Sequence, residues 1–382
     1  MKKSDLEYIY NVIPYDKMNT YSHNINTHPI SQYTRTLNRK GYNYSVERIV
    51  SGHRSINLLR KDGTLAGKLR SPVYPSNSDE GRSIANHKVR TEEYLRKVGV
   101  TAPISKIYTP DEMKKAKKEA FENSDQHVVI KPLNLSLGRG VFVDISEDDF
   151  EFYWNQCKSI MEEKKKNRDH YILVQNYLEG FEVRATVLEG KLISLIARVP
   201  AFVIGNGRNT IEELIDEKNK ERQKCGFLKN NQIKKSQAVQ SFIKQSNYTL
   251  DSIPDENEYV LLISVSNTNI GGETIDITDF ASKEIKETAL NALAALPEMH
   301  CGGIDVMIKD FDDRNPSVIE INPFPVLSLT MFPTYGTPSK PQEYFLDAFY
   351  AKDQYFNDIE DKYDIENAES YVKTYLDFKK RQ

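Results

Sequence analysis

The stretch from His127 to Asp144 constrains the fold of this 382-residue chain more than any other. Two apolar runs, Val128–Ile130 and Val141–Val143, flank a loop that carries two glycines. Because β-branched and aromatic residues favour strands, the pattern predicts two strands joined as a hairpin. A strand follows the glycines where a Walker A loop or a dinucleotide fingerprint would open a helix, so both of those phosphate loops are excluded.

The predicted hairpin loop is basic and able to approach an anion. Lys131 supplies a positive charge at the end of the first strand, and the loop adds a hydroxyl, a guanidinium and accessible backbone N–H groups from Ser136, Gly138, Arg139 and Gly140. Phosphate is the ligand that these groups fit. The alternative is a basic surface hairpin without a chemical role, and this stretch alone does not separate the two.

Length, charge and cysteine content narrow the class of protein. A chain of this length predicts two or three domains. A net charge of -3 and a sequence pI of about 6.2 give no overall attraction to nucleic acid or to an anionic membrane. Three scattered cysteines without a Cys-x-x-Cys pair indicate neither a disulfide framework nor a zinc site. Without a long apolar run or a signal-peptide pattern, the sequence predicts a cytoplasmic protein.

Local patterns predict most of the helices and strands. An Asp-Gly turn inside Ile56–Leu69 is typical of a hairpin, and the turn-rich Ser71–Gly81 indicates a boundary. Helices are expected over Ser83–Val98, from a Thr109 cap to about Asn123, over Phe150–Lys166, from a Thr210/Glu213 capping box, and around Ile285–Leu296. Strands are expected over Tyr171–Gln175, Phe181–Leu188, Lys191–Arg198, Tyr259–Val265 and Thr274–Thr278, and residues 219–258 read as the least regular part of the interior.

A second hairpin near the end of the chain carries paired acids. Gly303–Lys309 and Ser317–Asn322 are apolar strands, and pairing about the acidic loop between them sets Asp305 opposite Glu320. Glu320 and Asn322 are two residues apart and therefore share a face. Two carboxylates and an amide oxygen are hard ligands suited to Mg²⁺. The alternative is a solvent-facing acidic row.

These motifs, in this order, resemble the ATP-grasp family. The series is Lys-Pro, Ser-x-Gly-x-Gly, Gly-x-Glu, Gly-x-Asp-Val and Glu-x-Asn-Pro. The chain looks most like the ATP-grasp modules of cyanophycin synthetase and bifunctional glutathione synthetases, through Arg198–Ile215, Leu250–Pro254 and Asn267–Asp279. The resemblance covers about residues 83–340. It implies an α+β fold in which two α+β subdomains grip ATP, with a small N-terminal α/β domain.

The resemblance also implies a division of the chain. It gives a small N-terminal domain over residues 1–82, a subdomain with the phosphate hairpin over 83–178, and a subdomain with the magnesium hairpin over 179–340. Residues 341–382 form a helical tail, which is a candidate homodimer contact.

Site residues follow from the match. Lys88 and Lys131 would hold ATP phosphates, Ser136, Gly138, Arg139 and Gly140 would form a flap, Gln175, Asn176, Tyr177 and Leu178 would contact adenine, and Glu182 would bind ribose. Asp305, Glu320 and Asn322 would bind Mg²⁺, as two ions for which Mn²⁺ can substitute, while Arg184 and Arg198, with Lys131, act on transferred phosphate or substrate carboxylate.

Three departures from the family pattern stand out. His87 stands where Asp is common, Gln175 replaces the usual hinge acid, and Pro323–Pro325 replaces the common Pro-Gly. Alternatives remain open for individual residues, since Arg184 and Arg198 fit structural ion pairs and Glu182 fits a surface acid.

The implied activity is that of an ATP-dependent carboxylate–amine ligase. It would join an amino-acid or small-peptide carboxylate to an amine through an acylphosphate, releasing ADP and phosphate. The alternatives are a small-molecule kinase on the same fold and a non-catalytic ATP-binding regulator. Nucleic acid and membranes are not expected partners.

Overall fold

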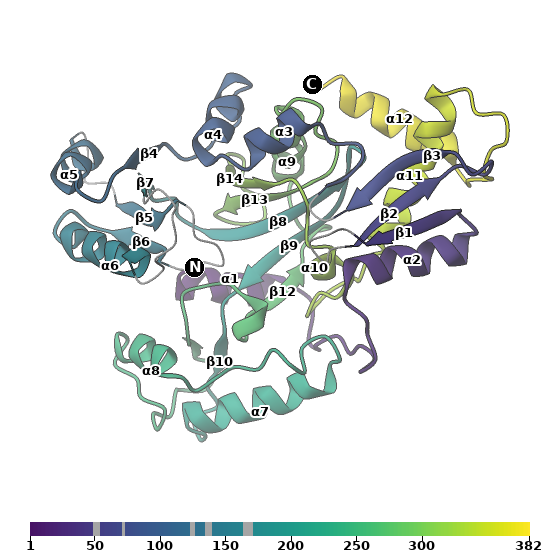
Figure 1. The fold of residues 1–382 in the computed structure, drawn as a ribbon. Coiled ribbons are helices and arrows are strands. Elements are labelled where there is room, and N and C mark those ends of the chain that lie inside the picture. The colour runs from purple at the N-terminus through teal and green to yellow at the C-terminus, as the bar shows by residue number, and fades with distance from the viewer. Residues whose placement is uncertain (49–53, 71–72, 123–126, 134–139, 163–170) are drawn as a thin grey trace. The chain divides into compact units, whose positions relative to one another are not determined.

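The computed structural model describes residues 1–48, 54–70, 73–122, 127–133, 140–162 and 171–382 (Figure 1). These form two compact units. The smaller unit is His87–Glu179, and the larger unit combines Met1–Asn86 with Gly180–Gln382. Each unit contains both helices and antiparallel strands, so the predicted α+β class is confirmed.

The smaller unit is a four-stranded antiparallel sheet with helices packed on one face. The strand order is β4 (Ser105–Tyr108), β7 (Ile172–Asn176), β5 (Val128–Pro132) and β6 (Phe142–Ile145). Alternate apolar residues of the sheet pack against the helices α5 (Met113–Phe121) and α6 (Phe150–Glu162), around the buried Trp154. The predicted strand pair after His127 is therefore confirmed, whereas Ser136, Gly138 and Arg139 lie outside the described residues.

The central element of the larger unit is a five-stranded antiparallel sheet. Its order is β12 (Glu273–Asp276), β9 (Lys191–Val199), β8 (Phe181–Leu188), β13 (Gly302–Ile308) and β14 (Ser317–Asn322). One face is apolar and packs against α9 (Lys283–Ala294), which buries its own apolar stripe there. Val183, Ala185, Ile304 and Val306 belong to this face and are fully buried.

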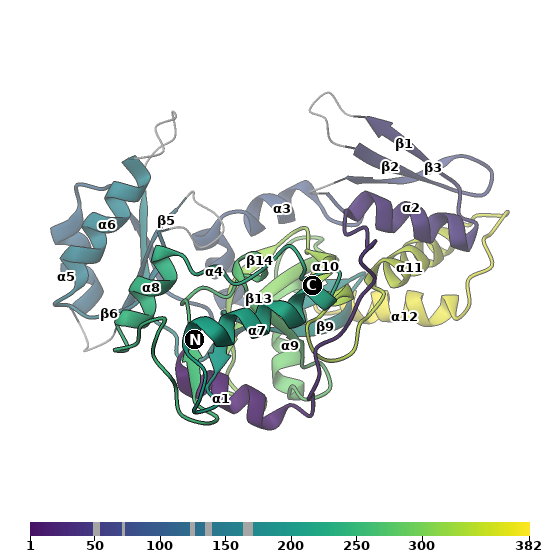
Figure 2. The ribbon, with the colours of Figure 1, turned by 90° about the horizontal axis from the view of Figure 1, so that it is seen from below.

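The two ends of the chain share one hydrophobic core within the larger unit. A three-stranded sheet contacts α2 (Pro29–Lys40), which packs on α11 (Pro341–Phe356) (Figure 2). The strands of this sheet are β1 (Tyr44–Arg48), β2 (Arg54–Leu59) and β3 (Leu65–Arg70). Buried Asp347 of α11 accepts hydrogen bonds from Lys40 Nζ at 2.5 Å and Tyr42 Oη at 2.7 Å. Buried residues between Ile30 and Tyr74 and between Phe345 and Val372 thus belong to one core.

The remaining elements complete the larger unit. β10 (Phe202–Ile204) pairs with β11 (Tyr259–Leu261), and α1 (Lys3–Val12) contacts β11. α7 (Ile211–Lys224) begins at the predicted Thr210/Glu213 capping box. The other helices are α8 (Gln237–Lys244), η1 (Thr268–Ile270), α10 (Leu327–Met331) and α12 (Ala368–Lys379). Across the described ranges, every helix is too short or too polar to cross a membrane.

Several predicted boundaries are wrong, and local polar groups explain two of the differences. Ser83–Val98 is two helices, α3 (Asp79–Ala85) and α4 (Lys88–Lys97), because Ser78 Oγ caps the first at 2.9 Å and His87 Nδ1 caps the second at 3.4 Å. The helix expected from a Thr109 cap begins later, at Met113. α8 forms inside a segment that was read as irregular, since Ser236 caps it, and the predicted strand Tyr259–Val265 ends at Leu261.

Candidate active site

A row of charged side chains crosses the face of the five-stranded sheet that lies opposite α9. Arg184 of β8 pairs directly with Asp305 of β13, which pairs with Glu320 of β14. The sequence-predicted opposition of Asp305 and Glu320 is therefore confirmed. Because directly paired residues share a face and residues two apart do too, Glu182 and Asn322 belong to the same row.

Arg184 and Asp305 form a buried, two-pronged ion pair. Nη2 of Arg184 donates to Oδ2 of Asp305 at 2.7 Å, and Nε donates to Oδ1. The two side chains are only 11% and 9% exposed. Burial lowers the pKa of Arg184, but the carboxylate of Asp305 outweighs it and holds that pKa above its usual value. Arg184 is therefore charged.

Gly303 leaves room for the guanidinium of Arg184. A Cβ at position 303 would lie 3.1 Å from Arg184 Nη1 and 3.3 Å from Pro325 Cβ. Such contacts are tighter than ordinary van der Waals packing. The Gly-x-Asp-Val motif therefore begins with glycine because a side chain at position 303 would crowd Arg184 and Pro325.

A second ion pair joins Glu182 and Arg198 beside the first. Nη1 of Arg198 donates to Oε1 of Glu182 at 2.5 Å and lies 3.8 Å from Oδ1 of Asp305. Burial and, after it, the charge of Asp305 raise the pKa of Glu182, Arg198 and Arg184 oppose the rise, and the resulting pKa is about 7. The Glu182 carboxyl therefore titrates near neutral pH.

The Asn322 side chain lies between the Glu320 carboxylate and the Arg184 guanidinium. In the better-satisfied orientation of its amide, the nitrogen donates to Glu320 Oε1 at 3.2 Å and the oxygen accepts from Arg184 Nη2 at 3.3 Å. The carboxylates and the amide oxygen form a hard-oxygen donor set that fits Mg²⁺. Both oxygens of Asp305 already accept from Arg184, so a bound cation would compete with that ion pair for the carboxylate. Within the described residues, no group of three or more His, Cys, Asp or Glu side chains gathers for a metal.

The smaller unit brings together a different set of polar side chains. Lys131 Nζ donates to Gln175 Oε1 across the sheet, on the face away from Trp154. Glu92 of α4 is buried beside them and accepts from Ser105 N at 3.0 Å and Ser105 Oγ at 2.6 Å. Burial raises the pKa of Glu92, which the Ser105 hydrogen bonds and the charge of Lys131 oppose. Sequence reasoning missed Glu92, whose only signal was an acid inside a helical pattern.

The other predicted residues of this unit lie at the ends of its elements. Lys88 is the first residue of α4, and Asn176 Oδ1 accepts from Ile104 N at 2.7 Å. Tyr177 N donates to His127 O at 2.9 Å, and Leu178 follows it. Gly140 has a φ of +69° and a hypothetical Cβ only 2.9 Å from Pro132 Cγ, so this position requires glycine.

Two known protein families match parts of the chain. Residues 100–224 match the prokaryotic glutathione synthetase ATP-grasp domain, and residues 213–326 match an ATP-grasp domain family. Together the two matches include Lys131 in the smaller unit and the charged row of the larger unit.

Individual relatives agree with these matches. The chain is 32% identical over 273 residues to a glutathione biosynthesis bifunctional protein of Clostridium perfringens, covering 70% of this chain and 34% of that protein. It is 28% identical over 268 residues to cyanophycin synthetase of Synechocystis sp., covering 68% and 29%. It therefore spans about a third of the length of these curated relatives.

A solved structure supports the fold. A bifunctional glutathione synthetase from Pasteurella multocida superimposes with a TM-score of 0.57 at 23% identity, over 84% of this chain and 43% of that chain. The family matches, the relatives and the fold agree, and the chain therefore belongs to the ATP-grasp superfamily.

Proposed function

We propose that this protein is an ATP-dependent carboxylate–amine ligase. The observation that carries the proposal is the charged row of Glu182, Arg184, Asp305 and Glu320 on an otherwise well-packed sheet. Arg184 and Asp305 are buried, and Glu182 and Glu320 are partly buried. Burial of charged groups costs stability, so such clusters concentrate at functional sites. The similarity to glutathione and cyanophycin synthetases favours a ligase over other ATP-using enzymes.

Asp305, Glu320 and Asn322 are the residues that would hold Mg²⁺. When bound, the ion neutralises phosphate oxygens and so eases attack on the γ-phosphorus of ATP. We extend the proposal to two ions, with Mn²⁺ as a substitute. Asp305 is central because its carboxylate also positions Arg184.

Arg184 and Arg198 bind the transferring phosphate or the substrate carboxylate. A guanidinium offers parallel N–H groups that match the oxygens of either group. Both arginines are held in place by acids of the same sheet, Arg184 by Asp305 and Arg198 by Glu182. Such preorganised donors stabilise charge that develops in the transition state.

In the smaller unit, Lys131 and Lys88 contact ATP phosphates and the loop Ser136–Gly140 covers them. Gln175 to Leu178 contact adenine, and Glu182 of the larger unit binds the ribose hydroxyls. Gln175 already accepts a hydrogen bond from Lys131, so this residue connects the phosphate contact to the base contact.

The proposed reaction balances in two steps. An oxygen of the substrate carboxylate attacks the γ-phosphorus, which gives an acylphosphate and ADP. An amine nitrogen then attacks the acyl carbon, phosphate leaves, and the nitrogen loses a proton to give an amide. Exclusion of water from the acylphosphate is what a covering loop provides.

A substrate screen tests the proposal. Purified protein is incubated with ATP, Mg²⁺ and pairs of amino acids or short peptides, and phosphate release and product mass are measured. The proposal predicts phosphate release that depends on both the carboxylate and the amine, with a product lighter by one water than the sum of the two substrates. A phosphorylated product without phosphate release would favour the kinase alternative, and binding of ATP without any turnover would favour the regulator.

Three further features remain predictions from the sequence. These are the cytoplasmic location, the lack of nucleic-acid and membrane partners, and a homodimer contact through residues 341–382. The segment 341–382 contributes buried side chains to the core of the larger unit, so only its exposed surface is available for such a contact.

A further inference from the structure

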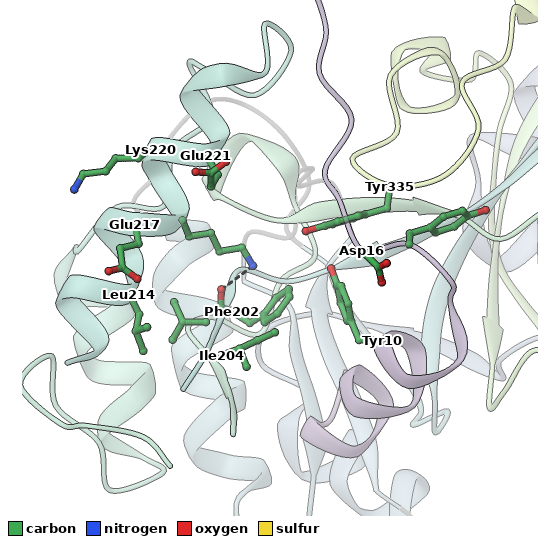
Figure 3. A pocket seen from close by; sticks show the side chains of 12 residues that line it. Tyr10, Asp16, Phe202, Ile204, Leu214, Glu217, Lys220, Glu221 and Tyr335 are labelled. Carbon is green, nitrogen blue, oxygen red and sulfur yellow. Dashed lines mark hydrogen bonds between the residues drawn. The ribbon is translucent and has the colours of Figure 1, made fainter. Parts of the chain in front are cut away.

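A pocket of about 590 Å³ lies in the larger unit and is lined in part by the three residues of β10, Phe202–Ile204 (Figure 3). Its volume is in the range of small-molecule sites. The aromatic rings of Tyr10, Tyr15, Phe202 and Tyr335 line it. Tyr10 lies 5.0 Å from Phe202 and 5.8 Å from Tyr335 between ring centres, so three of these rings form one wall.

The pocket belongs to the opposite face of the sheet from the charged row. Arg198 pairs with Thr274, whereas Val199 pairs with Glu273, so Glu273 points away from the face that carries Arg198. Tyr10 and Lys218, which line the pocket, both bond to Glu273. The sheet therefore separates this pocket from the proposed active site.

The lysines of the pocket are not available to recognise an anion. Lys218 Nζ lies 2.9 Å from Glu273 Oε1, donates to Phe202 O at 3.0 Å, and sits 3.3 Å from the centre of the Phe202 ring. These protein contacts satisfy its charge. Lys220 extends away from the cavity into solvent (Figure 3).

Carboxylate side chains line the pocket together with the aromatic rings. Asp16, Glu217 and Glu221 line the pocket, and all three are exposed. Asp16 makes no ion pair or hydrogen bond within the part of the chain that the structure describes, and Glu217 accepts one hydrogen bond, from Asn209 Nδ2 at 2.7 Å. Glu221 is already paired with Lys224 at 2.6 Å. Asp16 and Glu217 are thus the acids with capacity to bind a ligand.

The rings of Tyr10, Tyr15 and Tyr335 together with nearby carboxylates are the chemistry that recognises an organic cation. The Phe202 ring is already covered by Lys218. Ring faces attract ammonium and guanidinium groups, and carboxylates accept their hydrogen bonds. We propose that this pocket binds a small aliphatic ligand that carries a primary ammonium or a guanidinium. An adjoining cavity of about 410 Å³ shares Asp16, Lys218, Glu221 and Tyr335 with the pocket and is also lined by Lys17 and Lys224.

The site is partly built outside the matched domains. Tyr10, Tyr15 and Asp16 come from the first 16 residues, whereas the family matches begin at residue 100. The N-terminal segment thus supplies two of the four aromatic rings that line the pocket and one of the two available acids. The proposal rests on this geometry and does not depend on the proposed ligase activity.

Calorimetry on the full chain without ATP tests the proposal, with agmatine and 1,5-diaminopentane as probes and glutarate as an anionic probe of similar length. We expect both cations to bind and glutarate not to bind. Asp16→Asn and Glu217→Gln should each weaken agmatine binding about tenfold, which is the effect of losing one charged hydrogen bond. Glu256→Gln, at an exposed acid outside the pocket, is the matched control and should bind as the parent does.

A further variant tests the separation of the two sites. Glu320→Gln, in the charged row, should keep the parent affinity for agmatine, so a failed ligase assay and a failed pocket remain distinguishable. Binding of glutarate in place of agmatine, no agmatine binding at millimolar concentration, or equal agmatine affinity in the parent and both pocket variants would each overturn the proposal. Loss of agmatine binding in Glu320→Gln would overturn the separation from the active site.

Discussion

The buried pair of Arg184 and Asp305 makes a quantitative prediction about stability. Asp305→Asn removes the charge of one partner and leaves the guanidinium of Arg184 buried at 11% exposure. Breaking a buried pair on one side costs about 3–5 kcal/mol, and we expect about 3 kcal/mol because the new amide oxygen still accepts one hydrogen bond. With a slope of about 3 kcal/mol per molar urea, the midpoint should fall by about 1 M.

Urea unfolding can be followed with two reporters. Far-UV circular dichroism reports on both units, whereas fluorescence of the single tryptophan, Trp154, reports on the smaller unit. Asp305 belongs to the larger unit, so the dichroism transition should shift more than the fluorescence transition. Asp377→Asn is the matched control, because it breaks an exposed pair with Lys380 and should leave the midpoint unchanged.

A double variant distinguishes a charge effect from a general loss of packing. Adding Arg184→Met to Asp305→Asn removes the stranded charge and should restore part of the lost stability. A midpoint for Asp305→Asn within about 0.5 kcal/mol of the parent would refute the reasoning. So would a double variant as unstable as the sum of the two single variants.

Three further predictions follow from the same contacts. Lys131→Ala should weaken binding of a non-hydrolysable ATP analogue in calorimetry and lower turnover by orders of magnitude, and unchanged values of both would make Lys131 a structural residue. Folding raises the pKa of Glu182 from 4.5 to about 7, so the folded protein keeps this proton at pH values where the unfolded chain has lost it. The parent should therefore lose stability relative to Glu182→Gln as pH rises from 4.5 to about 7. Urea midpoints of the two proteins that change in the same way across that range would contradict this. Gly303→Ala should displace Arg184, whose Nη1 would lie 3.1 Å from the new Cβ, and lower turnover more than stability, whereas full activity would show that the strand yields.

Local patterns account for the features that the sequence predicted correctly. The opposition of Asp305 and Glu320 follows from one short loop between two strands, and the Thr210/Glu213 cap follows from three-residue spacing. These signals depend on neighbours within about fifteen residues, so a single sequence contains them. The opposition of the Asp305 and Glu320 carboxylates was therefore predictable.

Long-range pairing accounts for what the sequence did not predict. Arg184 meets Asp305 across 121 positions of the chain, through the pairing of β8 with β13. No periodicity specifies which strand lies next to which, and the same holds for the joint core of α2 and α11. The family resemblance gave Arg184 a phosphate or substrate role, but the ion pair that holds it came only from the structure.

Trapping of an acylphosphate tests the ligase proposal most directly. The protein is incubated with ATP, Mg²⁺, a carboxylate from the substrate screen and hydroxylamine, and the products are analysed by mass spectrometry. We predict a hydroxamate of that carboxylate together with equal amounts of ADP and phosphate. Glu320→Gln should form none of these three products. A stable phosphorylated product with no hydroxamate would contradict the proposed ligase mechanism.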